Sequence, residues 1–117
     1  MFFTKNGVRV RSKSELVIAE RFEIMGIPFR YECAVSVEWQ HWFPDFLVMN
    51  SRTGQEYYWE HFGLMSDASY CLNALRKIET FAKQGIIQGK NLIITMENDR
   101  HPLNTEYVDA LINAYLV

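Results

Sequence analysis

The chain has 117 residues, a length that suffices for one compact domain and leaves no room for a second. Apolar residues make up 49% and charged residues 22%, which is ordinary globular usage and excludes general disorder; two cysteines are too few for a disulfide scaffold. The net charge of −2 does not by itself indicate a nucleic-acid partner.

Two features of the sequence concern the cellular setting. No apolar stretch approaches the roughly 20 residues that cross a bilayer. The apolar start of the chain is too short for a secretory signal, because a charged residue already follows at Lys5. We therefore expect a soluble protein of the cytoplasm that has no membrane association.

The first 13 residues carry positive charge only. They contain Lys5, Arg9, Arg11 and Lys13, so all 14 acidic residues of the chain follow this segment. One interpretation is a basic N-terminal arm, residues 1–13, that contacts phosphates at one end of an acidic body. The alternative is a solvated, flexible start of the chain, and the sequence leaves both open.

The first predicted helix begins with a capping box. Ser12 and Glu15 have the spacing at which a hydroxyl and a carboxylate accept hydrogen bonds from early backbone N–H groups. Apolar residues follow at helical spacing, and Gly26 with Pro28 ends the helix. Residues 29–38 then alternate between apolar and polar side chains, which predicts one half-buried strand.

A β-hairpin is predicted in the middle of the chain. Strands 43–49 and 56–62 flank the turn 50–54. If the turn is centred between its third and fourth residues, Asp45 faces Glu60 directly, with Cβ atoms roughly 5 Å apart. Two opposed carboxylates repel, and a divalent cation would offset that repulsion. The alternative is a register shifted by one residue, which would place each carboxylate on a solvated face.

The last part of the chain predicts a helix, a strand and a second helix. The first helix runs from the cap at residues 66–67 to Gly85. Its inward apolar stripe comprises Cys71, Leu75, Ile78 and Ala82. Residues 91–96 form a short buried strand, and Thr105 caps the last helix. The order α-β-β-β-α-β-α in one domain, residues 1–117, predicts an α/β sandwich around a central mixed sheet.

Four segments of the chain carry a family resemblance. They are Arg11-Ser12-Lys13-Ser14-Glu15, Tyr31-Glu32, Pro44-Asp45-Phe46 and Tyr58-Trp59-Glu60-His61-Phe62-Gly63. With the order of predicted elements, over about residues 8–95, these segments resemble the PD-(D/E)XK nuclease superfamily and, within it, a group of small bacterial proteins. The resemblance implies a restriction-endonuclease-like core that hydrolyses phosphodiester bonds in DNA with a divalent metal ion.

The resemblance assigns the metal site to the predicted hairpin. Asp45, Glu60 and the backbone carbonyl of His61 would hold Mg²⁺ or Mn²⁺, and strand alternation directs the His61 ring to the opposite face of the sheet. Glu15 is a further catalytic candidate, because the superfamily often places an acid on its first helix; its capping role is the alternative explanation. Glu32 is expected to be a hydrogen-bonding or surface residue rather than a ligand.

The superfamily's usual lysine is missing from this sequence. Its position, two residues after Glu60, holds Phe62, which can neither orient nor deprotonate a water molecule. Superfamily members without this lysine often present one from the following helix, and Lys77 is the candidate here. Lys77 follows Tyr70 by seven residues, so both share a helix face within about 20°. The alternative is an ordinary solvated helix lysine.

These assignments predict a metal-dependent DNA nuclease. Lys77 would act on the attacking water or on the phosphoryl charge. Arg9, Arg11 and Lys13, which we call the N-terminal bases, would bind backbone phosphates. The small body favours a homodimer or a larger assembly. Two rival interpretations stay open: a degenerate module of the same fold that binds nucleic acid or a protein without cutting, which Phe62 favours, and a domain that binds no nucleic acid, which the acidic total charge favours.

Overall fold

The computed structural model describes residues 2–32, 35–37, 40–42 and 44–117. Its elements are β1 (Phe2–Phe3), β2 (Arg9–Val10), α1 (Lys13–Ile24), β3 (Phe29–Tyr31), β4 (Val35–Val37), β5 (Gln40–Trp42), β6 (Phe46–Met49), β7 (Glu56–Phe62), α2 (Ala68–Lys83), β8 (Leu92–Met96) and α3 (Thr105–Tyr115). Across this described part of the chain, three helices and a mixed four-stranded sheet form an α/β fold, as predicted. None of the helices in these ranges has the length and apolar character to cross a membrane.

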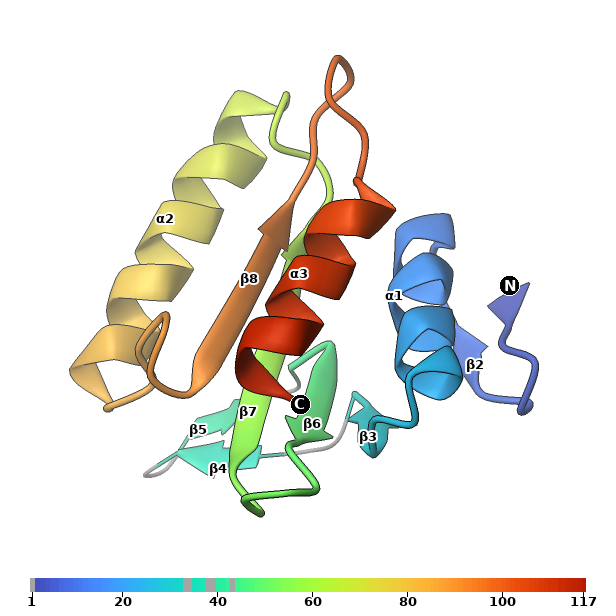
Figure 1. Ribbon diagram of the computed structural model, residues 1–117. Helices are drawn as coiled ribbons and strands as arrows, with labels where there is room; N and C mark the ends of the chain where they lie inside the picture. Colours follow the sequence, from blue (N-terminus) through green and yellow to red (C-terminus); the bar gives the residue numbers. More distant parts are fainter. Residues whose placement is uncertain (1, 33–34, 38–39, 43) are drawn as a thin grey trace.

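The central sheet has the strand order β3-β6-β7-β8. β3 and β7 each pair antiparallel with β6, and β8 joins β7 in parallel (Figure 1). The strand pairs β1–β2 and β4–β5 form two separate small sheets. The three helices and the four strands of the central sheet follow one another in the predicted order α-β-β-β-α-β-α.

Helices cover both faces of the central sheet (Figure 1). α1 and α3 pack on one face, where Phe22 and Ile112 join Trp59 in the larger core cluster. α2 packs on the other face, where Phe81 joins Phe62 in a second cluster. This division follows from the alternation of side chains along β7, because residues 59 and 62 point to opposite faces.

α1 begins at the predicted cap. The Ser12 hydroxyl accepts a hydrogen bond from the Glu15 N–H at 3.1 Å, as predicted. The Glu15 carboxylate accepts one from the Arg11 N–H at 3.2 Å, which lies one residue before the usual capping-box partner. Farther along the helix, Arg21 donates two hydrogen bonds, of 2.8 and 2.9 Å, to Asp109 of α3. This pair ties together the two helices on one face of the sheet.

The N-terminal segment folds back onto α1. β1 pairs antiparallel with β2, and Gly7 supplies the positive φ, 87°, that the tight connection requires. Val10 is completely buried in the larger core cluster, and Thr4 is also buried. Residues 2–10 are therefore a packed hairpin that carries the first basic side chains.

The prediction of a single strand over residues 29–38 is wrong. β3 ends at Tyr31, and Glu32 has a φ of 48°, a left-handed conformation that interrupts a strand. The Glu32 N–H donates to the Asp45 carbonyl at 2.9 Å, and its carboxylate pairs with Arg11 at 3.1 Å. These two tertiary contacts hold the turn in place.

Beyond this turn, β4 pairs antiparallel with β5 in a small separate hairpin. The sequence did not predict strand β5. Parts of the predicted strand, residues 33–34 and 38, lie outside the described residues. The same holds for Phe43, the expected start of the following strand, and β6 begins at Phe46.

The helix after the central hairpin is confirmed, but its predicted apolar stripe is right only in part, because Ile78 packs against the second cluster whereas Leu75 and Ala82 do not. α2 begins after the predicted Asp67 cap and buries Ala74 and Phe81. Leu75 is 53% exposed, and Ala82 is exposed as well. The helix carries apolar side chains on more than one face, so its contacts with β7 and β8, rather than its periodicity, select the inner face.

The last strand and helix are confirmed. β8 is almost completely buried from residue 92 to residue 95. α3 buries Val108 and Ile112 against the same face of the sheet as α1. Its N-cap is Asn104, whose side chain accepts from the Glu106 N–H at 2.8 Å, instead of Thr105.

Candidate active site

The hairpin register brings Asp45 next to Glu60. β6 pairs with β7 as predicted, with Phe46 opposite Trp59, and Asp45 directly precedes β6. The Asp45 N–H donates to Glu60 Oε1 at 3.0 Å, and the His61 N–H donates to Asp45 Oδ2 at 2.7 Å. Each carboxylate thus accepts a backbone hydrogen bond from the opposite side of the hairpin. The alternative register, shifted by one residue, is wrong.

Lys77 reaches this carboxylate pair from α2. Its Nζ donates to Glu60 Oε2 at 2.9 Å, and Glu60 is only 2% exposed. The ammonium lies 6.0 Å from the ring centre of Phe62 and 5.6 Å from that of Phe81, within cation–π distance. Lys77, the candidate that the resemblance supplies, therefore lies at the hairpin carboxylates, and Phe62 packs beside it. The catalytic role of Lys77 stays a prediction.

The Asp45 carboxyl is difficult to ionise. Its pKa is raised from 3.8 to about 7, first by burial and then by the negative charges of Glu60 and Glu15. The His61 N–H and the Lys77 ammonium oppose this rise. Such opposing effects on the pKa are expected where two neighbouring carboxylates share a single ammonium group. When Asp45 ionises, the site gains a negative charge beyond the one on Glu60 that Lys77 neutralises.

Glu15 lies on the α1 side of the same site. Its Oε1 accepts hydrogen bonds from the Tyr31 hydroxyl at 2.8 Å and from the Arg11 N–H, and its charge reaches Asp45. Burial raises the pKa of Tyr31, and its hydrogen bonds to Glu32 and Glu15 raise it further, so the phenol stays a donor. Glu32 is paired with Arg11, as expected of a hydrogen-bonding or surface residue.

Two clefts adjoin at Asp45, His61 and Tyr70. One, of about 320 Å³, opens between the sheet and α2 and is also lined by Glu60 and Lys77. The other, of about 490 Å³, opens toward α1. Its further lining includes Lys13, Ser14, Glu15 and Glu97. Asp45 can therefore be reached from both sides.

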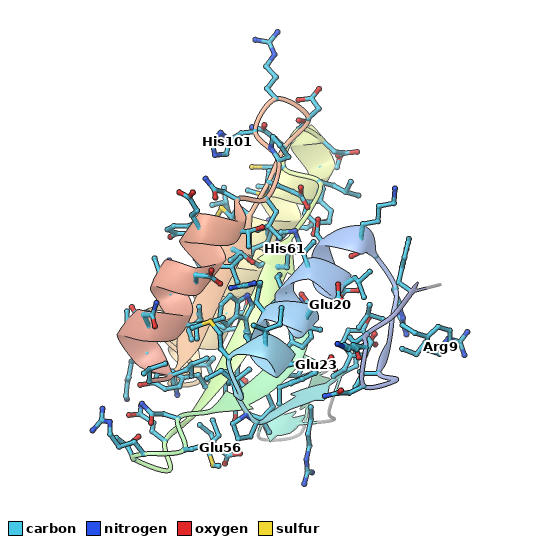
Figure 2. All side chains as sticks on the ribbon, turned by 45° about the vertical axis from the view of Figure 1, so that its right-hand side comes forward. Arg9, Glu20, Glu23, Glu56, His61 and His101 are labelled. Atoms are coloured by element: carbon cyan, nitrogen blue, oxygen red, sulfur yellow. The ribbon has the colours of Figure 1, made fainter. Side chains whose placement is uncertain are left out.

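The His61 ring lies on the opposite side of β7 from Glu60, as predicted, and in the interior of the molecule in Figure 2. Its Nδ1 is 2.8 Å from Thr95 Oγ1, and its Nε2 is 2.8 Å from Glu97 Oε1. Glu97 also accepts from the Ser14 hydroxyl and from a loop N–H. Burial acts to raise the pKa of Glu97, but its hydrogen bonds outweigh burial and lower the pKa.

Thr95, Glu97 and Ser14 are absent from the site residues that the sequence predicts. A signal was present, because Thr95 interrupts an apolar strand and Glu97 follows it at the spacing of one sheet face. Thr95 is also the β8 partner of His61. That register is set by packing across a helical crossover, and no short turn fixes it in the sequence.

The N-terminal bases have different surroundings. Lys13 is exposed and lines the cleft on the α1 side. Arg11 pairs with Glu32, although its side chain remains 76% exposed. Arg9 points outward at the periphery of the molecule, away from His61 (Figure 2). Of these three residues, Lys13 is the one that lines the cleft containing Asp45 and Glu15, and Arg11 contacts Glu15 through its backbone N–H.

The donor types at this site fit a hard divalent cation. Within the described ranges, no group of three or more His, Cys, Asp or Glu side chains converges as a ready metal cage. The Asp45 and Glu60 carboxylates and the His61 carbonyl are oxygen donors, which suit Mg²⁺, an ion that keeps several waters. A cation bound here would favour the ionised form of Asp45, while Lys77 competes with the cation for Glu60.

Comparisons with known proteins gave no relative for this chain. A scan against protein-family models found no match, and neither did searches of curated proteins and of solved structures. The function must therefore be inferred from the residues and the geometry of the chain itself.

Proposed function

We propose that the protein is a metal-dependent nuclease that hydrolyses phosphodiester bonds in DNA on a restriction-endonuclease-like core. The opposition of Asp45 and Glu60 across the β6–β7 hairpin, with the Lys77 ammonium 2.9 Å from Glu60, carries this proposal. The arrangement is costly for the fold, since the pKa of Asp45 is raised to about 7. A perturbed carboxyl that lines a cleft beside a charged partner favours an active site over a purely structural pair.

Each group has a role in the proposed reaction. Asp45, Glu60 and the carbonyl of His61 would hold Mg²⁺ or Mn²⁺, with Glu15 as an additional carboxylate nearby. When bound, the ion polarises the phosphate and lowers the pKa of a water molecule. Lys77 would orient the attacking water or stabilise the charge that develops on the phosphoryl oxygens.

DNA would be held through its backbone. The N-terminal bases supply positive charge for phosphates, and Lys13 lines the cleft that leads to Asp45. Such contacts carry no base sequence information, so we propose binding with little direct readout of bases. The small surface of the chain favours action as a homodimer or within a larger assembly, with a second copy enclosing the duplex.

A catalytically degenerate module of the same fold is the second candidate. The Lys77–Glu60 ion pair favours it, because an internal ammonium can neutralise a buried carboxylate without a metal ion. Phe62, at the position of the superfamily's lysine, favours it as well. Such a module would bind nucleic acid or a protein partner without cutting.

Nicking of supercoiled plasmid DNA tests the proposal. With millimolar Mg²⁺ or Mn²⁺, the wild-type protein should produce open-circular DNA, and EDTA should abolish the product. Asp45→Asn and Glu60→Gln should be inactive, whereas Asp109→Asn, which alters an ion pair between α1 and α3, should remain active. A wild-type protein that shifts DNA in a gel but nicks it with neither ion would favour the module. A lack of any salt-dependent shift would favour a domain without nucleic acid.

A further inference from the structure

A hydrogen-bonded network surrounds the His61 ring on the side of β7 away from Glu60. The ring nitrogens each lie 2.8 Å from an oxygen, one of Thr95 and one of Glu97, and the His61 side chain is only 4% exposed. Thr95 Oγ1 also accepts a hydrogen bond from Trp59 Nε1 at 3.2 Å. We call His61, Thr95 and Glu97 the histidine network.

The histidine network joins four segments of the fold. His61 lies on β7 and Thr95 on β8. Glu97 accepts a hydrogen bond from Ser14, in the first turn of α1, and another, at 3.0 Å, from the Leu103 N–H in the loop before α3. The residue after Ser14 is Glu15, whose charge reaches Asp45.

The histidine network is also connected to the proposed metal site through the backbone N–H of His61. The N–H of His61 donates to Asp45 Oδ2 at 2.7 Å, so the position of that carboxylate depends on the orientation of this peptide group. A buried ring held at both nitrogens cannot rotate without breaking a hydrogen bond, and an unsatisfied buried polar group is strongly disfavoured. The peptide that holds Asp45 is therefore fixed from the far side of the sheet.

We propose that His61, Thr95 and Glu97 are positioning residues for the metal site. They act indirectly, by fixing the peptide group that holds Asp45 and the helix turn that presents Glu15. This inference rests on the proposed function, because it relates the network to that site. Removing groups that orient metal ligands typically weakens metal binding by about 10- to 100-fold.

Two substitutions perturb the network with little change in shape. Thr95→Val keeps the volume of a buried side chain and removes the oxygen shared by His61 and Trp59. Ser14→Ala removes the contact between Glu97 and α1 and leaves the His61–Glu97 contact in place. If Thr95→Val folds poorly, Ser14→Ala still tests the proposal.

Ser66→Ala is the matched control. It also removes a hydrogen bond from a serine hydroxyl to a carboxylate of the β8–α3 connection, here Asp99 at 2.6 Å, together with the bond that the Asp99 N–H donates to that hydroxyl at 3.0 Å. Both of these side chains are exposed and lie outside the histidine network. A general effect of loosening that connection would therefore appear in the control as well.

Two measurements separate positioning from stability. Mn²⁺ affinity is measured by calorimetry at a temperature at which every variant is fully folded. We expect about 10- to 100-fold weaker binding for Thr95→Val, a smaller loss for Ser14→Ala and no change for Ser66→Ala. The second measurement is hydrogen exchange of the His61 amide without metal. It should accelerate in Thr95→Val by a larger factor than the exchange of other β7 amides.

The possible failures are distinguishable. If the wild type binds Mn²⁺ and Thr95→Val binds it equally well despite lower stability, the network is only structural, and the proposed nuclease function stands. Weaker Mn²⁺ binding with unchanged His61 amide exchange also overturns the inference, because the effect would not pass through this peptide group. If the wild type binds no Mn²⁺, the proposed function fails and the inference fails with it.

Discussion

Replacement of Asp45 by asparagine removes one charge from the carboxylate pair and keeps the shape of the side chain. In the metal-free protein the pKa of Asp45 is about 7 instead of 3.8, so the native state binds this proton more tightly than the unfolded state. Ionisation of Asp45 therefore opposes folding, and stability falls as pH rises from about 4 to about 7. The asparagine oxygen can still accept the hydrogen bond from the His61 N–H.

The size of the effect follows from the pKa. One pKa unit corresponds to about 1.4 kcal/mol, so the gap between 3.8 and about 7 sets an upper limit of about 4 kcal/mol at pH 8. Relaxation of the neighbouring groups reduces it, and we expect Asp45→Asn to raise the free energy of unfolding by about 2 to 4 kcal/mol at pH 8. At pH 4 the gain should fall below about 1 kcal/mol. In a chain of this length, each kcal/mol raises Tm by about 4 °C.

Thermal and urea unfolding in EDTA at pH 4, 6 and 8 measure the effect. Asp109→Asn is the control of opposite sign, because it weakens an ion pair with Arg21 and should destabilise the protein at pH 8. A gain for Asp45→Asn that is equal at pH 4 and pH 8, or a loss at pH 8, would refute the electrostatic reasoning. Millimolar Mg²⁺ should raise the Tm of the wild type but not of Asp45→Asn. An equal rise in both would mean that the ion binds elsewhere.

Three further predictions concern the groups around this pair. Lys77→Ala should lower the rate of DNA cleavage by roughly 100-fold or more, while Lys83→Ala on the same helix should change it little; plasmid nicking kinetics measure both. Neutralising all three N-terminal bases should weaken the salt dependence of DNA binding, measured by gel shift. The slope of the logarithm of the binding constant against the logarithm of the salt concentration should become less steep by about 0.9 for each lost phosphate contact. Tyr31→Phe removes a hydrogen bond to Glu15, so it should destabilise the protein by about 1 kcal/mol in urea unfolding and weaken Mn²⁺ binding in calorimetry.

The hairpin could be predicted because its determinants are local in the sequence, whereas the choice of Lys77 came from the family resemblance. A short turn fixes which residues of β6 and β7 face each other, so the position of Asp45 beside Glu60 follows once the turn is located. Helical periodicity adds that Lys77, seven residues after Tyr70, shares a helix face with it, and both residues line the same cleft.

The break after β3 and the partners of His61 depend on contacts between distant segments. Glu32 adopts a positive φ, which is rare for glutamate, where the Asp45 carbonyl and the Arg11 side chain hold it. An alternating sequence pattern contains no information about those contacts. Thr95 lies 34 residues from His61, and the helix between their strands leaves the pairing of β8 to packing.

Successive side chains of β7 point to opposite faces of the sheet, so the strand contributes to the candidate site on one face and to the packed interior on the other. Glu60 points toward α2 and Lys77, where a carboxylate can be reached from a cleft, whereas His61 points to the other side and is enclosed by Thr95 and Glu97. The N–H between these two side chains holds Asp45, so the charged pair and the buried ring share one peptide group. A shift by one residue would turn the carboxylate into the aromatic core and the ring into the cleft. The register of β7 is therefore constrained by the site as well as by the core.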